Sequence, residues 1–433
     1  TAAGVSVNQF RQFDIDQQGA VVNNGRTASQ TAIAGWVAAN PALLSGEARV
    51  IVNEVRSNNP SLLNGYVEIA GGKADFIIAN PSGISCNGCG FIHASRVELA
   101  TAKPTIEDGK HTGYAMGHGM LEVAGSGLDA SRVDALSMLT QAARVNAGIW
   151  ANNLRLELNT SPGMPETPAA PSFALDVAQL GGMYANRIWL VGSAHGLGVR
   201  NAGNWSASDT LVVSIDGKLE NSAGIDARDV KIQATNLDNV AQGKILGEYV
   251  ALQADRIANA GHPEASPVIA AAADLDIGAR VLENTDQATI FSGRDMYIGR
   301  QLDANGHATG KAERVLNRFA TIESLGKLSL HTSLLQNLNA GVDLEEVQVG
   351  QTVDMAYLKP SGSTQQYTMD HFYWTKWSRA GQYKWVTDKE QLENGIPGRT
   401  PLPDVDGVDC TDEAGTECTP TPGSAYPRDD PAW

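Results

Sequence analysis

Four cysteines are the residues best placed for chemistry, and they stand in two close pairs, Cys86 with Cys89 and Cys410 with Cys418. A CxxC pair can carry out thiol redox chemistry when a helix N-terminus stabilises the thiolate, but Asn87-Gly88 is a turn sequence. A structural zinc site needs four ligands at compact spacing, and more than 300 residues separate the two pairs. Two local pairs therefore predict two disulfides, formed in an oxidising compartment, with no metal and no cofactor.

Two pairs of carboxylates also deserve consideration as catalytic groups. Asp14 with Asp16, and Asp274 with Asp276, would each project from one face of a strand. Glycoside hydrolysis uses two carboxylates, so these pairs keep a polysaccharide-degrading enzyme open as an alternative. In an acidic chain such pairs are more often solvated surface, and no Ser-His-Asp order or phosphate-binding loop accompanies them. We assign no catalytic residue and expect no enzyme.

The composition restricts the possible partners. The 433 residues include 48 Asp and Glu against 32 Lys and Arg, which gives a net charge of −16. A surface of this sign repels phosphate backbones, so we expect no nucleic-acid partner. No apolar run approaches the ~20 residues that a membrane-spanning helix needs.

A recurring asparagine reveals the organisation of the chain. Most of its occurrences are 18 to 25 residues apart, and each Asn follows an apolar residue and one other residue. The asparagines are Asn201, Asn221, Asn239, Asn259, Asn284, Asn317 and Asn337. Short segments with period-two alternation, such as 230–234 and 250–254, lie between them, and alternation of this kind is typical of strands. A repeat near 20 residues built only from strands predicts a parallel β-helix with stacked asparagine amides at one corner. A β-sandwich is the alternative, but it would need hairpins that the pattern lacks.

The first part of the chain has less regular turns. Residues 10–25 and 51–84 alternate well, yet the spacing between their turns varies. The end of a solenoid exposes unpaired backbone and needs an atypical terminal unit, so we expect a β cap here.

Two motifs in this region, followed by a third stretch, carry a family resemblance. "NNPSLLNG" includes Asn59 to Leu62, and "ANPSGISCNGCGFI" includes Asn80 to Ile84. This order resembles the paired motifs of the two-partner secretion domain that opens large exoproteins related to filamentous haemagglutinin. The stretch 180–203, "LGGMYANRIWLVGSAHGLGVRNAG", is similar to the segment that closes that domain. The resemblance covers about residues 1–210, and the repeats to about residue 345 are similar to haemagglutinin repeats.

The resemblance implies a fold and a mechanism. The fold would be all-β, a right-handed parallel β-helix with an N-terminal cap and extra-helical hairpins. The partner would be an outer-membrane two-partner secretion transporter, with periplasmic domains and a barrel, that passes the chain unfolded. The chain would fold outside the cell of a Gram-negative bacterium, after transit through the periplasm. Cys-Asn-Gly-Cys at this position is found in contact-dependent growth inhibition effectors and in some haemolysins.

The same resemblance assigns the secretion address to the residues of the two motifs. These are Asn59, Pro60, Ser61, Leu62, Asn80, Pro81, Ser82, Gly83 and Ile84. Both motifs carry serine where the family has asparagine, at Ser61 and Ser82, and serine should preserve the turns. If the first motif is structural, Asn59→Ala should lower the melting temperature, and if the second motif is the contact, Asn80→Ala should block export with melting nearly unchanged. We expect Asn80 to be the more sensitive position, because the adjacent disulfide would hold its turn rigid.

The chain therefore divides into four expected parts. Residues 1–260 would be the secretion domain and 261–345 the haemagglutinin-type coils, whereas 346–396 would form an aromatic-rich extra-helical segment and 397–433 a Pro- and Asp-rich tail. In the third part, Phe372, Trp374 and Trp385 predict a hairpin packed on the coils near 315–345. Four prolines spaced by three in 162–171 predict an extended loop.

These expectations combine into one functional hypothesis. The chain would be the secretion-targeting domain and filament base of a large exoprotein, either a growth-inhibition effector or a filamentous adhesin. A secreted haemolysin of the same class, or the polysaccharide-degrading enzyme, is the alternative. A monomer is expected, and a target-cell receptor would be bound by C-terminal regions outside this chain.

Overall fold

The fold was obtained as a computed structural model. It describes residues 4–43, 45–159, 173–193, 196 and 198–339, and the backbone of four short strand segments between 357 and 387. The chain divides into two compact units, Thr1–Val342 and Asp343–Trp433. The proline-rich loop, the tail after residue 397 and the Cys410–Cys418 pair lie outside the described residues. No helix within the described part is long and apolar enough to span a membrane.

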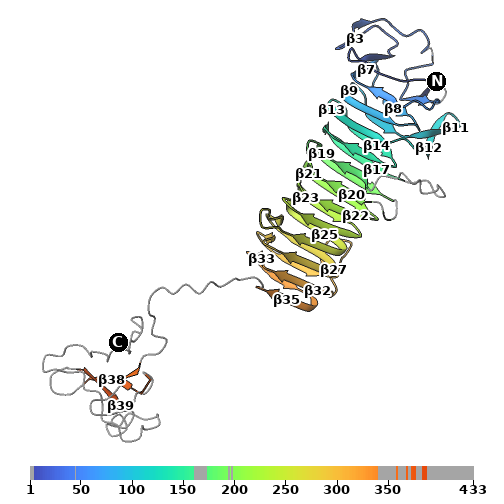
Figure 1. Cartoon of the computed structure of the whole chain (residues 1–433). Helices are drawn as coiled ribbons and strands as arrows, with labels where there is room; N and C mark the ends of the chain where they lie inside the picture. The colour runs from blue at the N-terminus through green and yellow to red at the C-terminus, as the bar shows by residue number, and fades with distance from the viewer. Residues whose placement is uncertain are drawn as a thin grey trace. The chain divides into compact units, whose positions relative to one another are not determined.

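The first unit is a stack of coils in which each turn of the chain crosses three faces (Figure 1). Strands pair in parallel with the equivalent strand of the next coil, from β1 at one end to β35 at the other. The prediction of a parallel β-helix is confirmed. The coils also continue without interruption through residue 260, where we expected the secretion domain to end, because β25 (Lys244–Ala260) pairs with both neighbouring coils.

The strands can be grouped by face. The first face contains β1 (Val5–Phe10), β5 (Val50–Val55), β8 (Asp75–Ala79), β10 (Arg96–Ala100), β14 (Ala135–Thr140), β17 (Asn153–Leu158), β29 (Met296–Gly299) and β34 (Leu328–Leu330). The second face contains β6 (Ser61–Leu63), β15 (Ala143–Val145), β18 (Phe173–Val177), β20 (Gly198–Asn201), β22 (Lys218–Asn221), β24 (Asn236–Val240), β32 (Ala312–Arg318) and β35 (Thr332–Leu338). The third face contains β2 (Ala20–Asn24), β7 (Tyr66–Gly71), β16 (Gly148–Ala151), β26 (Val268–Ala271), β28 (Thr289–Ser292) and β33 (Thr321–Ser324).

Longer strands bend around a corner and contribute to more than one face. Those that join the second and third faces are β9 (Ile84–Ile92) and β13 (Leu121–Ala130). Those that join the third face to the first are β19 (Gly182–Gly192), β21 (Asn204–Ile215) and β23 (Gly224–Gln233). The strand β27 (Leu275–Thr285) joins the first face to the second, and β25 crosses all three.

Apolar side chains fill the interior of the coils. Alternate residues point inward in many strands of the stack, for example in β21 and β23, and the largest fully buried side chains include Trp205, Phe76 and Phe91. Each inward residue packs on its equivalents in the coils above and below, so burial is shared between neighbours. Truncation of such a core residue to alanine costs about 2–5 kcal/mol.

A column of asparagines follows the corner between the second and third faces. Each amide nitrogen donates to the amide oxygen of the next coil, and the Asn221–Asn239 and Asn239–Asn259 distances are both 2.8 Å. The ladder comprises Asn201, Asn221, Asn239, Asn259, Asn284, Asn317 and Asn337. The predicted amide ladder is thus confirmed. In the coils before Asn201 the same register position is apolar or cysteine, and its occupants are Leu63, Cys86, Val123, Val145 and Val177.

Antiparallel hairpins leave the stack. They are β3 (Ser29–Thr31) with β4 (Gly35–Val37), β11 (Ala102–Glu107) with β12 (Lys110–Met116), and β30 (Gln301–Leu302) with β31 (Ala308–Thr309). Figure 1 places the first of them at the N-terminal end of the stack, where a cap was expected. The carboxylate of Glu68 accepts hydrogen bonds from the amides of Ala32 and Ile33, which ties this segment to β7.

The second unit contains the aromatic-rich segment. Strand β38 (Phe372–Lys376) pairs antiparallel with β39 (Tyr383–Thr387), and Trp374 lies opposite Trp385 in the register. The pairing confirms the predicted hairpin, whereas the packing of its aromatic side chains on the coils near 315–345 stays a prediction. A second antiparallel pair joins β36 (Tyr357–Leu358) to β37 (Tyr367–Thr368).

Candidate functional site

The two motifs form turns that lie directly one above the other. Both turns occupy the corner between the first and second faces: the first joins β5 to β6, and the second joins β8 to β9. Ser61 pairs with Ile84 in the register, so the turns belong to consecutive coils. The motifs therefore lie in the second and third coils rather than in the irregular cap itself.

Asn80 ties the two turns together. Its amide nitrogen donates to the Asn59 carbonyl at 2.9 Å and to the Ser61 hydroxyl at 3.0 Å. Its amide oxygen accepts the backbone amide of Ser82 at 2.9 Å, which fixes the start of its own turn. The side chain is fully buried, and a single residue thus satisfies groups in both motifs.

The two serines have defined structural partners. Ser61 is fully buried, its hydroxyl accepts the Asn80 amide, and its backbone amide donates to the Gly83 carbonyl at 3.0 Å. The Ser82 hydroxyl donates to the Ser57 carbonyl at 3.1 Å. Both turns are therefore preserved although serine replaces the family's asparagine.

Of the two stacked turns, the first motif contributes the exposed side chains. Asn59 and Pro60 are exposed, and Leu62 is 45% exposed although its backbone amide donates to the Asp14 carboxylate. The structure therefore places Asn59 at the surface and the Asn80 side chain in the interior. A fully buried amide presents no atom to a partner protein.

The second motif is buried because the next coil covers it. Gly117 and Gly119 pass over the second motif, and the Gly119 amide donates to the Pro81 carbonyl at 2.8 Å. A Cβ on Gly117 would lie 2.3 Å from the Pro81 carbonyl oxygen, and one on Gly119 would lie 2.0 Å from the Gly83 nitrogen. Sequence reasoning missed these glycines, although "GHG" at 117–119 is a recognisable small-residue pattern.

A groove of about 420 Å³ lies beside the stacked turns. Its lining includes Arg56, Ser57, Pro81, Ser82 and Lys103. Arg56 pairs with Glu54 at 3.2 Å, whereas Lys103 is exposed on the β11–β12 hairpin. The groove therefore offers cationic and hydrogen-bonding groups next to the exposed edge of the first motif.

The Cys86–Cys89 disulfide is present and closes a sequence separation of three. Both cysteines are buried among core residues, and Gly88 between them has a φ of 77°. We expected a tight turn after the second motif, but the pair lies within β9, where the pairing with β13 shifts register. Its place is therefore the second-to-third corner, in the apolar column that precedes the asparagine ladder.

The β11–β12 hairpin covers the first face next to the motif corner. Its Ile106 and Tyr114 pack on buried residues of β5 and β8, Val52 and Ile77 among them. This cover buries Glu98 of β10, and burial raises the pKa of its carboxyl group, an effect that Tyr114 and His111 only partly offset. The hairpin therefore covers part of this face, and a groove of about 460 Å³ remains beside it, lined by Asp75, Glu98 and His111 among others.

The carboxylate pairs that suggested catalysis have structural partners. Asp14 accepts the Leu62 amide and Asp16 accepts the Gln18 amide. The Arg294 guanidinium lowers the pKa of Asp274, whereas burial raises the pKa of Asp276, whose carboxylate accepts the Ala308 amide at 2.7 Å. Within the described residues, no group of His, Cys, Asp and Glu could hold a metal ion.

Comparison with known families gives a match to the TPS secretion domain over residues 1–221. Three relatives illustrate the similarity. A "Toxin CdiA" of Yersinia pestis is 46% identical over 52% of this chain and 7% of its own length. A "tRNA nuclease CdiA-2" of Burkholderia pseudomallei is 41% identical over 50% of this chain and 7% of its own length. A "tRNA nuclease CdiA" of Yersinia mollaretii is 32% identical over 84% of this chain and 12% of its own length.

The chain thus spans 7% to 12% of the length of these curated relatives. Among solved structures, the filamentous hemagglutinin secretion domain aligns with a TM-score of 0.47 and 21% identity. That alignment covers 78% of this chain and 90% of the other.

Proposed function

This chain belongs to the TPS secretion domain family, and from that premise we propose that the stacked turns are the secretion address. Two-partner secretion exoproteins reach the surface of Gram-negative bacteria through the periplasm, and their secretion domain interacts with a cognate outer-membrane transporter. The matched region is a secretion domain rather than a catalytic domain. The address would consist of the two motifs, Asn59 to Leu62 and Asn80 to Ile84.

The observation that carries this proposal is that the second motif is buried at Asn80, whereas the first motif has exposed side chains. The buried Asn80 amide holds the two turns together, and the exposed Asn59, Pro60 and Leu62 form the accessible edge. An exposed leucine next to a groove that holds Lys103 and an Arg56–Glu54 ion pair suits a contact with a partner that offers apolar and acidic groups. We infer that the second motif shapes the address and the first motif contacts the periplasmic domains of the transporter.

Export of single variants tests the contact. Leu62→Ala and Asn59→Ala should lower the ratio of secreted to periplasmic protein when the chain is co-expressed with its cognate transporter. Leu180→Ala is a matched control, because Leu180 is 86% exposed and lies away from the motifs. Melting of each purified variant should stay close to that of the wild type, since Leu62 and Asn59 are both exposed and neither belongs to the buried core.

Normal export of an Asn59→Ala/Leu62→Ala double variant would refute the proposed contact. Loss of export in Asn80→Ala together with a lowered melting temperature would fit the structural role that we assign to the second motif. Loss of export in Leu180→Ala to the same degree would show that export responds to surface changes in general.

The class of the full-length exoprotein is a separate part of the proposal. Relatives named CdiA support a contact-dependent growth inhibition effector in preference to an adhesin or haemolysin. Residues 1–260 would then be the secretion domain and 261–345 the first filament coils, with no catalytic function, no nucleic-acid partner and a monomeric state. A target-cell receptor would be bound by a more distal region.

A growth competition tests the effector hypothesis. Cells that express the full-length protein and its transporter should inhibit target cells that lack the cognate immunity function, and removal of residues 59–84 should abolish inhibition. Surface display without any inhibition of such target cells would favour an adhesin.

A further inference from the structure

Aromatic side chains form a column on the outside of the third face. Trp150 and Tyr184 pair in the register, and their rings are stacked with centroids 6.3 Å apart and planes 15° apart. The next residue of the column towards the N-terminus is Asp129, which accepts the Tyr66 hydroxyl at 2.9 Å across the intervening Gly90. We define Tyr66, Trp150 and Tyr184 as the aromatic column.

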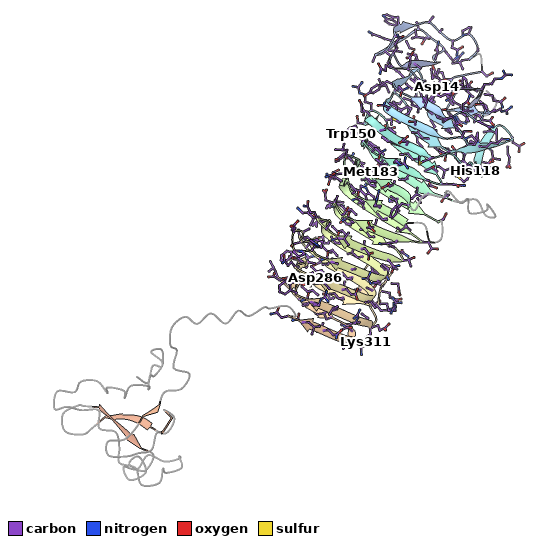
Figure 2. All side chains as sticks on the ribbon, viewed as in Figure 1. Asp14, His118, Trp150, Met183, Asp286 and Lys311 are labelled. Carbon is purple, nitrogen blue, oxygen red and sulfur yellow. A yellow bond between two sulfur atoms is a disulfide. The ribbon has the colours of Figure 1, made fainter. Side chains whose placement is uncertain are left out.

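Two members of the column are open to solvent. Trp150 is 43% exposed and Tyr184 is 37% exposed, which is unusual for large aromatic groups on a sheet whose inner side is fully packed. Figure 2 places Trp150 and His118 on opposite sides of the stack, so the column lies away from the end of the β11–β12 hairpin. No described hairpin contributes an aromatic partner to this pair.

Glycines make room for the rings against the backbone. A Cβ on Gly148 would lie 2.5 Å from the Trp150 ring, and a Cβ on Gly182 would lie 2.7 Å from the Tyr184 hydroxyl. A Cβ on Gly90 would likewise lie 2.2 Å from the Tyr66 ring. Each ring therefore lies close over a glycine of its own or the next coil. The rings therefore lie against the backbone, while part of the surface of Trp150 and Tyr184 stays exposed.

The column continues into a groove further along the same face. Tyr184 pairs with Ser206, and Ser206 pairs with and donates to Asp226 at 3.1 Å. Asp226 lines a groove of about 780 Å³, whose walls also include Gly224, Lys244, Leu246 and Ala272. The rings and the groove together form an elongated surface along the stacking direction, with aromatic, small apolar and hydrogen-bonding groups.

We propose that this surface binds a linear glycan that carries no negative charge. The apolar C–H face of a sugar ring is attracted to the electron-rich face of an indole or phenol ring, and its hydroxyl groups can bond to the carboxylates at either side. Asp129 and Asp226 stand in the same column as the rings, and the groove adds Glu248 and Lys244, so carboxylates outnumber cations among these groups and an acidic polysaccharide would be repelled. Charge therefore selects a neutral or amino-sugar polymer.

A protein partner fits this surface less well. A stable protein interface needs a contiguous apolar centre, whereas glycines and polar residues surround these two rings. The transporter is the remaining protein candidate, and its contact is assigned to the motif corner rather than to this face. This last point depends on the proposed function, and the glycan would be met after folding outside the cell.

Calorimetry on the full chain tests the proposal with defined probes. Cellohexaose, chitohexaose and maltohexaose are the neutral probes, and hexagalacturonate is the acidic one. We expect at least one neutral hexasaccharide to bind and hexagalacturonate not to bind. Trp150→Ala and Tyr184→Ala should each weaken that binding by about tenfold or more. Trp36→Ala is the matched control, because Trp36 is 73% exposed on the β3–β4 hairpin and should leave binding unchanged.

Trp150→Leu separates folding from recognition, because leucine keeps an apolar cover over Gly148 but removes the aromatic face. It should melt like the wild type and still lose binding. The proposal is overturned if none of the neutral probes binds at millimolar concentration, if hexagalacturonate binds more tightly, or if Trp150→Leu binds like the wild type.

Export of the Trp150→Leu/Tyr184→Ala variant should be normal; loss of export would assign the surface to the transporter instead. Failure of glycan binding with normal export leaves the secretion address intact.

Discussion

The buried amide of Asn80 donates at 3.0 Å to the buried hydroxyl of Ser61, 19 residues earlier in the chain, and so joins the two motifs. The same amide nitrogen donates to the Asn59 carbonyl. A polar side chain in such a position is costly to remove, because its partners are left without hydrogen bonds inside the fold. The two motifs are therefore one structural unit.

Replacement of Asn80 by alanine should destabilise the domain by about 2–4 kcal/mol, because Ser61 and the Ser82 amide lose a buried partner. Thermal unfolding followed by circular dichroism would measure this. Asn59→Ala is the matched control and should change the melting temperature little, since Asn59 is exposed. Equal melting of the Asn80 variant and the wild type would contradict this assignment.

Replacement of Asn239 in the middle of the ladder should cost about 3 kcal/mol. Asn239→Ala removes an acceptor from Asn221 and a donor from Asn259, both of which are fully buried. Asn337→Ala at the exposed last rung should cost less than about 1 kcal/mol, because water can replace the lost bond to Asn317. Chemical denaturation of the two variants gives their free energies of unfolding, and equal losses would contradict the expected difference between a buried and an exposed rung.

Removal of the disulfide should cost roughly 2 kcal/mol, the loop-closure value for so short a loop. Cys86→Val/Cys89→Ala suits the site, since Leu63 and Val123 occupy the neighbouring positions of the column. Because both cysteines are buried, a mild reductant should act on the bond only when the domain unfolds. Rapid reduction in the native protein would show that the β9–β13 corner opens.

Mass spectrometry should also find Cys410 and Cys418 joined, which remains a prediction from the sequence.

The stability of the β11–β12 cover should depend on the charge of Glu98. Burial raises the pKa of Glu98 above 4.5 in the folded protein, so folding favours the protonated carboxyl. The contribution is present below the unfolded pKa and is lost as the pH rises through the folded pKa. Glu98→Gln should therefore be more stable than the wild type at neutral pH and should lose this pH dependence.

Melting temperatures measured from pH 4 to pH 8 would test the effect of Glu98. Glu107→Gln, at an exposed position of the same hairpin, is the control and should follow the wild-type curve. A Glu98→Gln variant that is less stable than the wild type at pH 7 would indicate that the charged carboxylate is stabilising.

The sequence by itself determined the architecture and several of its parts. Asn221, Asn239 and Asn259 recur at the length of one coil, and a fixed coil length places equivalent residues in one column. The close spacing of Cys86 and Cys89 similarly determined their pairing, because three residues of chain hold the sulfur atoms near each other. The hairpin of β38 and β39 also follows from local alternation and the short connection between its strands. These features depend on local geometry or on periodicity, both of which are visible in one dimension.

Only the tertiary structure decided which motif faces solvent. Asn59 and Asn80 both begin Asn-Pro-Ser, yet Asn80 is buried because the first motif lies on one side of it and Gly117 to Gly119 on the other. The aromatic column has the same origin, since Tyr66, Trp150 and Tyr184 are far apart in the chain and meet only through the register of the coils. Burial and lateral proximity depend on what the neighbouring coil contributes, and extra-helical insertions such as β11–β12 make the number of residues between coils irregular, so sequence spacing could not supply them.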